Sequence, residues 1–314
     1  MGVVGLGIHF METLLPALIG QHGVILSAFC DRSAEKLDWV KTRFSQAAIT
    51  NQVSGADFWT AVDCVVCCSW PIVHEQVLML AIDHGKHCFC EKPAATSVAA
   101  LDQIIRKRGI SDLVIRIGHT LRYMGGARRF IDLLSEHDLA CMEITYLGSG
   151  PNGSRWEMDQ RKSFSLTHLT HAVDFVTAAA GKVIVVNDAT WATTGNTDSL
   201  AVSFLTERCK LVNLFATNAA PAFTCKATGV LASGSLVHLN SLRDVTLTGK
   251  TPAEKRSGDI WKERDLGTTP QNDGYMDELR DFFAEVRGGG QCRLPDLIHA
   301  AHVLKVIEEV EGRD

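Results

Sequence analysis

The stretch VVGLGIHFMETLLPAL, residues 3–18, decides the fold of the N-terminal part of the chain. It places Gly5 and Gly7 between a short apolar run and a segment whose apolar residues recur at helical spacing. In a strand–turn–helix unit, the first glycine permits a tight turn, and the second lets the backbone approach a diphosphate at the helix N-terminus. Phe10 stands where this pattern has a third glycine, so we expect its ring to pack against an apolar face of the helix or sheet.

An acidic residue follows at the position that a dinucleotide site requires. Asp31 ends the apolar run ILSAFCD, where a carboxylate accepts hydrogen bonds from adenosine ribose hydroxyls. The same carboxylate can instead cap the next helix. Asp31 favours NAD(H), whereas Arg32, which can stack on adenine or pair with a 2′-phosphate, leaves NADP(H) open. The predicted cofactor-binding residues of this part are Gly5, Gly7, Ile8, His9, Phe10, Asp31 and Arg32.

The first 120 residues alternate between two kinds of segment. Short apolar runs occupy 2–4, 24–30, 63–68, 87–90 and 113–118, and helical patterns occupy 8–20, 33–45, 72–84 and 96–107. Strands that are apolar on both faces and separated by amphipathic helices predict a parallel sheet covered on both sides. The sequence thus predicts an α/β, doubly wound (Rossmann) dinucleotide-binding domain over residues 1–120.

The pattern changes after residue 120. Seven predicted strands follow, at 141–148, 183–192, 198–205, 209–217, 227–232, 235–240 and 244–248. A helical segment at 165–180 interrupts them, and the chain ends in helical patterns at 276–288 and 294–312. We predict a C-terminal α+β domain over residues 121–314, with a mostly antiparallel, open-faced sheet that serves substrate binding and oligomerisation.

Composition excludes several classes of function. The 314-residue chain has a net charge of −5 and only short basic runs, which argues against nucleic acid as a partner. No apolar run of about 18 residues predicts a membrane span, and no signal peptide is recognisable, so we expect a cytoplasmic protein. Its 10 cysteines lie mostly in apolar runs such as CVVCC, where they serve as small apolar residues, and we expect no metal.

Four further motifs follow one another in the first half: SWPIVH (69–74), GKH (85–87), EKP (91–93) and GHTLRY (118–123). In order and spacing they resemble the glucose–fructose oxidoreductase and inositol dehydrogenase (Gfo/Idh/MocA) family of NAD(P)-dependent enzymes. The resemblance spans essentially the whole chain, and the Glu-Lys-Pro element is its most specific part. It implies further cofactor contacts by Ser69, Trp70, Pro71, His74, Glu91 and Lys92.

Lys92 is a candidate catalytic residue on physical grounds as well. It follows a predicted parallel strand, at the sheet edge where ligands bind in open α/β folds. The proline after it favours an extended backbone. An ammonium group at this place can hydrogen-bond a substrate oxygen and stabilise developing charge; the alternative is a surface lysine in a loop.

The family signature Asp-x-Gly-x-His-x-x-Asp corresponds here to the stretch KSFSLTHLTHAVDF, residues 162–175. His171 takes the place of the family histidine, Asp174 that of the last acid, and Thr167 that of the first aspartate. The resemblance implies a general acid/base role for His171. Thr167 can orient the histidine but cannot accept its proton. His168 lies one turn before His171 and can share its face; helix packing is the alternative for both histidines.

The segment GPNGSRWEMDQRKSF, residues 150–164, is the predicted substrate loop. Trp156 can shield the nicotinamide or form the floor of the pocket, or it can be a core aromatic. Arg161 and Lys162 replace small residues of the family and suggest an anionic group on the substrate. The predicted substrate-contacting residues are Arg122, Tyr123, Trp156, Arg161, His168 and His171.

These observations predict an NAD(P)-dependent oxidoreductase. It would transfer a hydride between nicotinamide and a C–O carbon of a small polar, sugar-, cyclitol- or keto-acid-like substrate that can be anionic. Two alternatives remain: an imine reductase acting on a carboxylated intermediate, and a non-catalytic dinucleotide-binding regulator, which Thr167 favours. The resemblance and the apolar residues of LAVSFL (200–205) and LVNLFA (211–216) also predict a homodimer or homotetramer.

Overall fold

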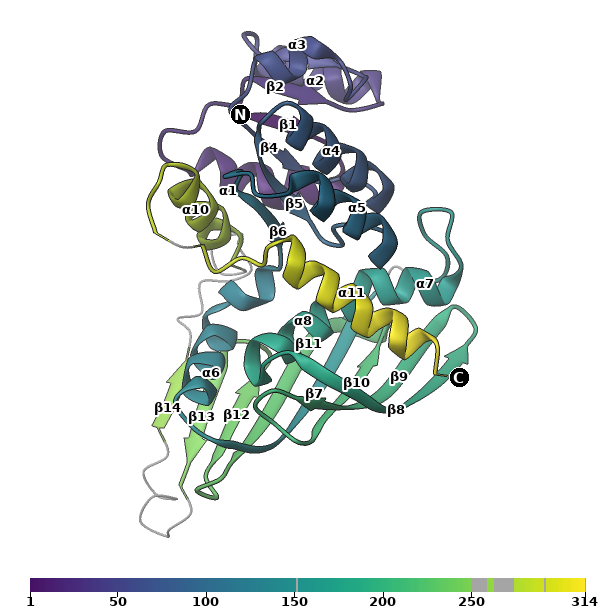
Figure 1. Cartoon of the computed structure of the whole chain (residues 1–314), viewed down its shortest axis with the longest axis vertical. Coiled ribbons are helices and arrows are strands. Elements are labelled where there is room, and N and C mark those ends of the chain that lie inside the picture. Colours follow the sequence, from purple (N-terminus) through teal and green to yellow (C-terminus); the bar gives the residue numbers. More distant parts are fainter. Residues whose placement is uncertain (151, 250–258, 263–273, 291, 314) are drawn as a thin grey trace. The chain divides into compact units, whose positions relative to one another are not determined.

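The computed structural model describes residues 1–150, 152–249, 259–262, 274–290 and 292–313, with only the backbone described at 259–262. The chain divides into two compact units. The first consists of Met1–Thr120 and Thr268–Ala301, and the second of Leu121–Gly267 and His302–Asp314. Figure 1 labels the elements of both units. Helix α10 belongs to the first unit, although its sequence lies beyond the whole second sheet. The functions predicted for the two domains stay predictions.

The first unit contains a six-stranded parallel sheet in the order β3-β2-β1-β4-β5-β6. Its strands are β1 (Gly2–Val4), β2 (Ala28–Cys30), β3 (Ala48–Thr50), β4 (Cys64–Cys67), β5 (His87–Glu91) and β6 (Ile115–Gly118). Its helices are η1 (Phe10–Leu14), α1 (Leu15–Ile19), α2 (Ala34–Arg43), α3 (Ala56–Thr60), α4 (Pro71–Asp83), α5 (Val98–Arg108) and α10 (Tyr275–Val286). The strand order reverses at β1, which is the position where doubly wound sheets bind ligands. The predicted Rossmann fold is confirmed.

Opposite faces of this sheet are covered by different helices. On one face, ligand atoms of Cys67, His74 of α4 and Cys90 lie within 4.8 Å of one another. On the other, Phe282 of α10 packs edge-on against Phe89, with ring centroids 5.9 Å apart. Because alternate residues of a strand point to opposite faces, the neighbours Phe89 and Cys90 place α10 and α4 on opposite sides of β5.

Helix α10 is fixed to the first unit at both ends. Near its start, Gln21 donates a hydrogen bond to the carbonyl of Met276 at 3.0 Å. Near its end, Glu285 accepts two hydrogen bonds from Arg116 of β6, at 2.7 and 2.5 Å. A planar guanidinium paired in this way with a carboxylate fixes both position and orientation.

Some local predictions for the first unit were wrong. Residues 24–27 are not part of β2, and β3 and α3 were not predicted. The three residues of β3 are all half-buried at the sheet edge and have no contrast between the faces. A strand this short and this evenly exposed gives no periodic signal.

The second unit is built on an eight-stranded mixed sheet in the order β14-β13-β12-β11-β7-β10-β9-β8. Its strands are β7 (Leu139–Ser149), β8 (Val183–Thr194), β9 (Thr197–Thr206), β10 (Val212–Thr217), β11 (Ala219–Leu231), β12 (Leu236–Asn240), β13 (Asp244–Thr248) and β14 (Asp259–Lys262). Pairings are antiparallel except between β10 and β7. The predicted mostly antiparallel sheet is confirmed, but β14 and residues 219–226 of β11 were missed.

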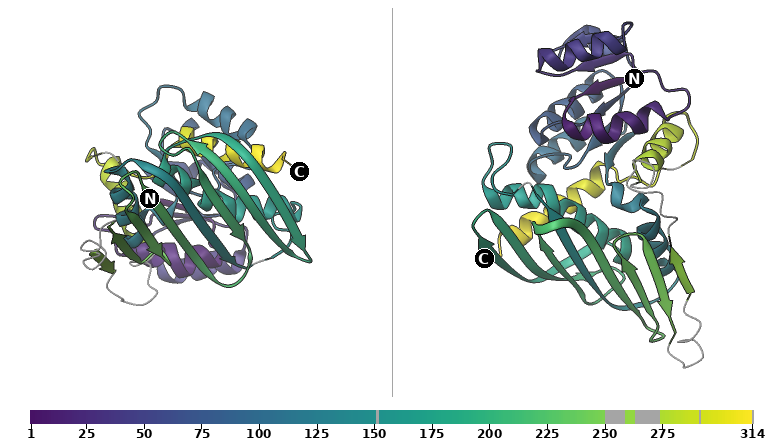
Figure 2. Two further views of the ribbon diagram at one scale, coloured as in Figure 1. Left: turned by 90° about the horizontal axis from the view of Figure 1, so that it is seen from below. Right: turned by 180° about the vertical axis from the view of Figure 1, so that it is seen from behind.

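Helices cover one face of this sheet, and Figure 2 shows its strands from two further directions. The helices are η2 (Thr120–Tyr123), α6 (Gly125–Ser135), α7 (Gln160–Phe164), η3 (Ser165–Leu169), α8 (Thr170–Ala180) and α11 (Leu297–Glu311). The residues of α11 up to Ala301 group with the first unit. Among the helices in the described ranges, none combines the length and apolarity needed to cross a bilayer. All ten cysteines are free thiols.

Candidate functional site

The glycine turn of the first unit has a closed side and an open side. Gly5 has φ +91°, and a Cβ there would overlap the carbonyl oxygen of Cys68, so only glycine fits. A Cβ on Gly7 would meet nothing within 4 Å. Such an open approach to the backbone, just before the N-terminus of a helix, suits a diphosphate.

Phe10 is fully buried, as predicted from its place in the turn. It begins η1, a π-helical turn that continues directly into α1. The wider π-helical turn thus begins at Phe10, the bulky residue at the position of the third glycine in the dinucleotide-binding motif. Ile8 is 77% exposed and His9 is also exposed, so both side chains stay on the outside of the turn.

Asp31 ties the glycine turn to the end of β2. One carboxylate oxygen accepts the N–H of Leu6 at 2.6 Å, and the other accepts the N–H of Ser33 at 2.8 Å. The residue that caps the following helix, α2, is Ser33 and not Asp31: the Ser33 hydroxyl accepts the N–H of Lys36. Each carboxylate oxygen has a second lone pair, so Asp31 can still accept ribose hydroxyls.

The ends of β2 and β4 meet through a cation–π contact. The guanidinium of Arg32 lies 5.1 Å from the ring centroid of Trp70, which is 39% exposed. Trp70 caps α4, and Pro71 is the first residue of that helix, where its missing N–H costs no hydrogen bond. Two flat groups with accessible faces therefore flank the sheet edge beside Asp31.

His74 holds two strand ends together from inside the fold. Its Nε2 accepts the N–H of Ser69 at 3.0 Å, and its Nδ1 lies 2.8 Å from the carbonyl of Pro93, to which it donates. The ring is 1% exposed, and burial lowers its pKa, so it is neutral. His74 thus fixes the loops after β4 and β5, and its link to a cofactor runs through Ser69 and Pro93.

Glu91 and Lys92 stand at the end of β5. Glu91 is buried, which favours the neutral acid, but the hydrogen bond and charge of His9 and the charge of Lys92 outweigh burial and lower its pKa. Its Oε1 lies 3.4 Å from His9 Nε2, and its Oε2 accepts the N–H of Lys92 at 3.2 Å. Lys92 is half-buried. The predicted turn residue His9 and the predicted strand-end residues are therefore brought together.

Two residues of α10 that were not predicted join this group. The ring of Tyr275 packs edge-on against His9, with centroids 5.5 Å apart. Glu278 is fully buried, and its pKa is raised well above the usual value by burial and by the charge of Glu91. No signal in YMDELRDFF, residues 275–283, marks either residue. An acid such as Glu278 in the first turn of an amphipathic helix is ordinarily solvated.

In the second unit, Thr167 and His171 lie four residues apart on η3 and α8. Both are half-buried, whereas most of the residues around them are buried. Four residues are about one helical turn, so the two side chains share a face. The π turn η3 lies within this segment, and such turns occur frequently at functional sites.

His168 has different surroundings from His171. It is 5% exposed and lies near the rings of Tyr146 and Phe164, at 6.1 and 5.5 Å between centroids. A Cβ on Gly148 of β7 would overlap its ring, so this ring packs against the sheet. These contacts match the packing alternative for His168, and its substrate role stays a prediction.

Arg122 forms an ion pair with Asp174. Its Nε and terminal nitrogen donate to both oxygens of Asp174, at 2.7–3.1 Å. Asp174 is completely buried. The pair joins η2 to α8, and Tyr123, the other residue predicted there, is 3% exposed. Both residues therefore have structural roles within the second unit, whatever they contact besides.

The structure describes the predicted substrate loop apart from residue 151. Lys162 forms an ion pair with Glu311 of α11 at 3.0 Å, and Arg161 stacks over Trp191 of β8 at 4.8 Å. Arg155 lies 4.7 Å over Trp156 and has no carboxylate partner among the described residues; burial lowers its pKa. Within the described residues, Arg155 is thus a half-buried basic side chain of this loop without a carboxylate partner.

The loop around Arg155 is held in an unusual conformation. Trp156 and Glu157 have φ of +54° and +63°, values that side chains larger than glycine seldom adopt. The hydroxyl of Ser163 accepts the N–H of Arg155 at 2.8 Å and donates to the carbonyl of Asp159 at 2.7 Å. The start of the helical segment therefore fixes the loop that precedes it.

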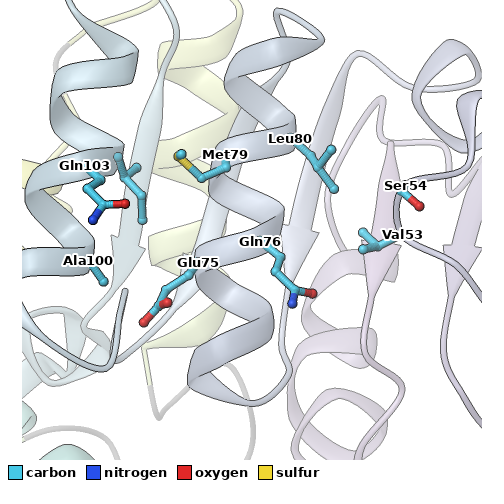
Figure 3. A pocket seen from close by; sticks show the side chains of 9 residues that line it. Val53, Ser54, Glu75, Gln76, Met79, Leu80, Ala100 and Gln103 are labelled. Carbon is cyan, nitrogen blue, oxygen red and sulfur yellow. The ribbon is translucent and has the colours of Figure 1, made fainter.

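Two other features of the first unit lie apart from these residues. A groove of about 480 Å³ runs along α4 and α5 and is lined by Glu75, Met79, Gln103 and their neighbours (Figure 3), and none of the predicted site residues lines it. The group Cys67–His74–Cys90 has metal-ligand types, but both nitrogens of His74 are already hydrogen-bonded and burial raises the pKa of Cys90. This donor set does not suit a metal ion.

A sequence model of the Gfo/Idh/MocA oxidoreductase family, described as its NAD-binding Rossmann fold, matches residues 1–119. Residues 1–119 therefore carry the NAD-binding Rossmann domain of the Gfo/Idh/MocA oxidoreductase family. The predicted family is confirmed for this part of the chain. The open backbone at Gly7 and the acid that ends β2 fit such a cofactor.

Two named enzymes are similar to parts of the chain. Inositol 2-dehydrogenase of Cereibacter sphaeroides is 36% identical over 74 residues, which are 23% of this chain and 22% of that enzyme. 4-Carboxy-2-hydroxymuconate-6-semialdehyde dehydrogenase of Sphingobium is 26% identical over 183 residues, 57% of this chain and 58% of that enzyme. The matches thus span from about a fifth to somewhat over half of these relatives.

A solved dehydrogenase from Chromobacterium violaceum has the same fold along the whole chain. It superposes with a TM-score of 0.90 and 24% identity, over 100% of this chain and 94% of the other. At 24% identity this similarity shows a shared fold only. The shared fold includes the second sheet, which lies outside the residues that the family model matches.

Proposed function

We propose that the protein is an NAD(P)-dependent dehydrogenase or reductase that acts on an oxygen-bearing carbon of a small polar substrate. The observation that carries the proposal is the set of residues around the glycine turn: Gly7 open to a diphosphate, Asp31 at the end of β2, and Lys92 at the end of β5. When bound, the nicotinamide cofactor accepts or supplies the hydride.

The chain's own residues would orient the substrate and handle its proton. Lys92 would hydrogen-bond the substrate oxygen and stabilise negative charge on it. Glu91, ionised and bonded to the N–H of Lys92, fixes the backbone from which that ammonium projects. His171 would give or take the hydroxyl proton, with Thr167 on the same helix face to orient it. Lys92 and His171 belong to different units, and their cooperation is part of the proposal.

The preferred cofactor in this proposal is NAD(H). Each carboxylate oxygen of Asp31 accepts one backbone N–H, and the carboxylate places a negative charge beside the ribose position. That charge would repel a 2′-phosphate. Arg32, which could have attracted that phosphate, lies over Trp70. The ratio of the Kd values for NADPH and NADH, measured by fluorescence titration, should exceed 1 and should decrease in Asp31→Ser.

For the substrate, we propose a hydroxyl or carbonyl compound that also carries an anionic group. Arg155 supports the anion, since it is half-buried, has no carboxylate partner in the described ranges and is fixed by Ser163. The related muconate semialdehyde dehydrogenase is named for a carboxylated compound, and the inositol dehydrogenases for a cyclitol. Lys162 and Arg161, which the sequence suggested for this role, are occupied by Glu311 and Trp191.

Absorbance at 340 nm, with a panel of polyols, hydroxy acids, keto acids and imines, tests the proposal. Lys92→Met and His171→Asn should each lower kcat by about 100-fold or more while NADH still binds, because they remove transition-state interactions. Arg155→Ala should raise KM for acidic substrates, with Lys162→Ala as the matched control. NADH that binds tightly but is never oxidised would indicate a regulator, and turnover confined to imines would indicate an imine reductase.

We also propose that the protein is a homodimer or homotetramer. The sheet of the second unit exposes the large apolar side chains of Phe215 and Phe223, and Leu211 just before β10 is exposed as well, each by more than 40%. Light scattering after gel filtration measures the assembly, and Phe215→Asp should shift it toward the monomer. A monomeric wild-type protein at micromolar concentration would refute this part.

A further inference from the structure

Glu278 is an acid in an environment that does not compensate a charge. Its side chain on α10 is completely buried, and neither of its carboxyl oxygens has a hydrogen-bond partner among the residues that the structure describes. An isolated charge in such a place costs several kcal/mol, so a buried carboxyl ordinarily stays protonated. Consistent with this, burial and the charge of Glu91 raise the pKa of Glu278 well above its usual value.

The geometry of β5 and α10 places Glu278 beside Glu91. Phe89 of the strand contacts Phe282 of the helix. Two residues further along the strand is Glu91, on the same face, and one helical turn before Phe282 is Glu278. Two residues of a strand and one turn of a helix both advance by about 6 Å, so the two acids face each other as the two phenylalanines do.

The neighbouring strand leaves room for this arrangement. Gly118 of β6 pairs with Glu91. A Cβ on Gly118 would lie 2.8 Å from the ring of Phe89 and 3.3 Å from the carboxyl group of Glu91. Any larger residue would therefore push these side chains away from their places against α10.

The two carboxyls have unequal surroundings. Glu91 interacts with His9 on the glycine turn and with Lys92 after β5, and their attraction keeps it ionised. The third titratable neighbour, His74 on α4, is neutral. The thiols of Cys68 and Cys90 also lie within reach of the charge of Glu91, and burial raises the pKa of each. Glu278 has the charge of Glu91 itself as an electrostatic neighbour, with Tyr275 one turn earlier on the same helix.

We propose that Glu278 and Glu91 form a buried two-carboxyl site that holds one proton, and that this site positions His9 and Lys92 for the dinucleotide. Glu278 is then a positioning residue. Held as the neutral acid, it lets the single charge of Glu91 attract His9 and bond the N–H of Lys92. The second half of this inference rests on the proposed function; the proton sharing does not.

Loss of the shared proton would disturb the cofactor site in a defined direction. When the O–H bond of Glu278 breaks and the proton passes to solvent, two negative charges lie side by side in a buried space. Their repulsion displaces Glu91 from its two partners, and the added negative charge opposes a diphosphate at the nearby turn. Dinucleotide affinity should therefore fall as the pH rises through the midpoint of the pair.

The test compares Glu278→Gln with the wild-type protein. Glutamine keeps the shape of the neutral acid but cannot ionise. Carbon-13 NMR of protein labelled at the glutamate carboxyl carbons should contain one resonance that is lost in Glu278→Gln and that titrates with a midpoint well above the ordinary value of 4.5. A midpoint at or below 4.5 overturns proton sharing without reference to any cofactor.

NADH fluorescence titration from pH 5.5 to 9 tests the positioning. Below the midpoint the two proteins should bind within about threefold of each other. Above it, the ratio of wild-type Kd to Glu278→Gln Kd should rise by up to about tenfold per pH unit. Glu285→Gln on the same helix, where the acid is paired with Arg116, is the matched control and should keep the wild-type pH profile.

The outcomes separate this inference from the proposed function. A constant ratio of the two Kd values across the pH range, or a Glu285→Gln profile like that of Glu278→Gln, overturns the positioning role. If neither protein binds NADH at any pH, the proposed function fails, and the NMR midpoint alone decides proton sharing. Should Glu278→Gln fail to fold, Glu278→Met supplies a second neutral side chain of similar length for the same comparison.

Discussion

The ion pair between Arg122 and Asp174 should dominate the stability of the second unit. The side chain of Asp174 is 1% exposed and that of Arg122 is 18% exposed, with three nitrogen–oxygen contacts of 2.7–3.1 Å. At an effective dielectric constant of about 20, unit charges some 2.8 Å apart attract by roughly 6 kcal/mol, which desolvation largely offsets. Removing one partner should therefore cost about 3–5 kcal/mol, because the other charge stays buried.

The unequal burial predicts an order of effects. Arg122→Met removes the bidentate partner of the more deeply buried charge, so it should destabilise more than Asp174→Asn. The double variant should recover part of the loss, since no charge is then stranded. Lys41→Met, which breaks the exposed pair with Asp38, is the matched control and should cost less than about 1 kcal/mol.

Urea unfolding measures the total effect, and hydrogen exchange in peptides of α8 assigns it to the second unit. The reasoning is refuted if both single variants cost less than 1 kcal/mol, or if Asp174→Asn costs more than Arg122→Met. The same variants address the predicted substrate role of Arg122. A KM change in the conservative Arg122→Lys without a change in stability would show that Arg122 contacts the substrate in addition to Asp174.

Three further outcomes follow from the first unit. Gly5→Ala should disrupt the folded turn, because its Cβ overlaps Cys68 at φ +91°, whereas Gly7→Ala should change stability by less than about 0.5 kcal/mol yet weaken NADH binding in fluorescence titrations. Below pH 6.5 the unfolded chain binds a proton at His74, whereas burial in the folded protein lowers the pKa of His74 and keeps the ring neutral. The free energy of unfolding should therefore fall by about 1.4 kcal/mol for each pH unit below 6.5, until the pH reaches the lowered pKa of the folded state. In His74→Gln, urea unfolding at several pH values should lack that slope. Asp31→Ala removes the acceptor of two backbone N–H groups, so hydrogen exchange at Leu6 and Ser33 should accelerate even without cofactor.

The residues around the glycine turn were predictable because local sequence sets their geometry. A strand of three or four residues, two glycines and a helix place Gly5, Gly7 and Ile8 without help from distant parts of the chain. Asp31 and Lys92 were found for a related reason. Both end a parallel strand, and all such ends lie at the same edge of the sheet. Periodicity thus identified both the fold of the first unit and the edge at which its ligand would bind.

The roles of charged side chains were less predictable than their positions. The sequence presents Arg122, Arg161 and Lys162 as basic residues near a substrate site, but Asp174, Trp191 and Glu311 occupy them. These partners come from α8, β8 and α11, and one of them lies 149 residues away in the chain. Spacing within a motif carries no information about such partners. Arg155, which the local pattern treats like its neighbours, has no carboxylate partner among the described residues.

Glu278 is the clearest case of chemistry that local sequence does not encode. In MDELRDFF it has the helical position of an ordinary solvated acid, and the two phenylalanines after it are what an amphipathic helix requires. Its burial arises only because Phe282 packs on Phe89, which carries the preceding turn of α10 over the end of β5. There the charge of Glu91, a carboxylate, acts on it with the same sign. A charged residue in this setting must lose its charge or disrupt the packing, and the fold retains the packing. The acid–base property of Glu278 is therefore a consequence of tertiary structure, and it becomes measurable only in the folded protein.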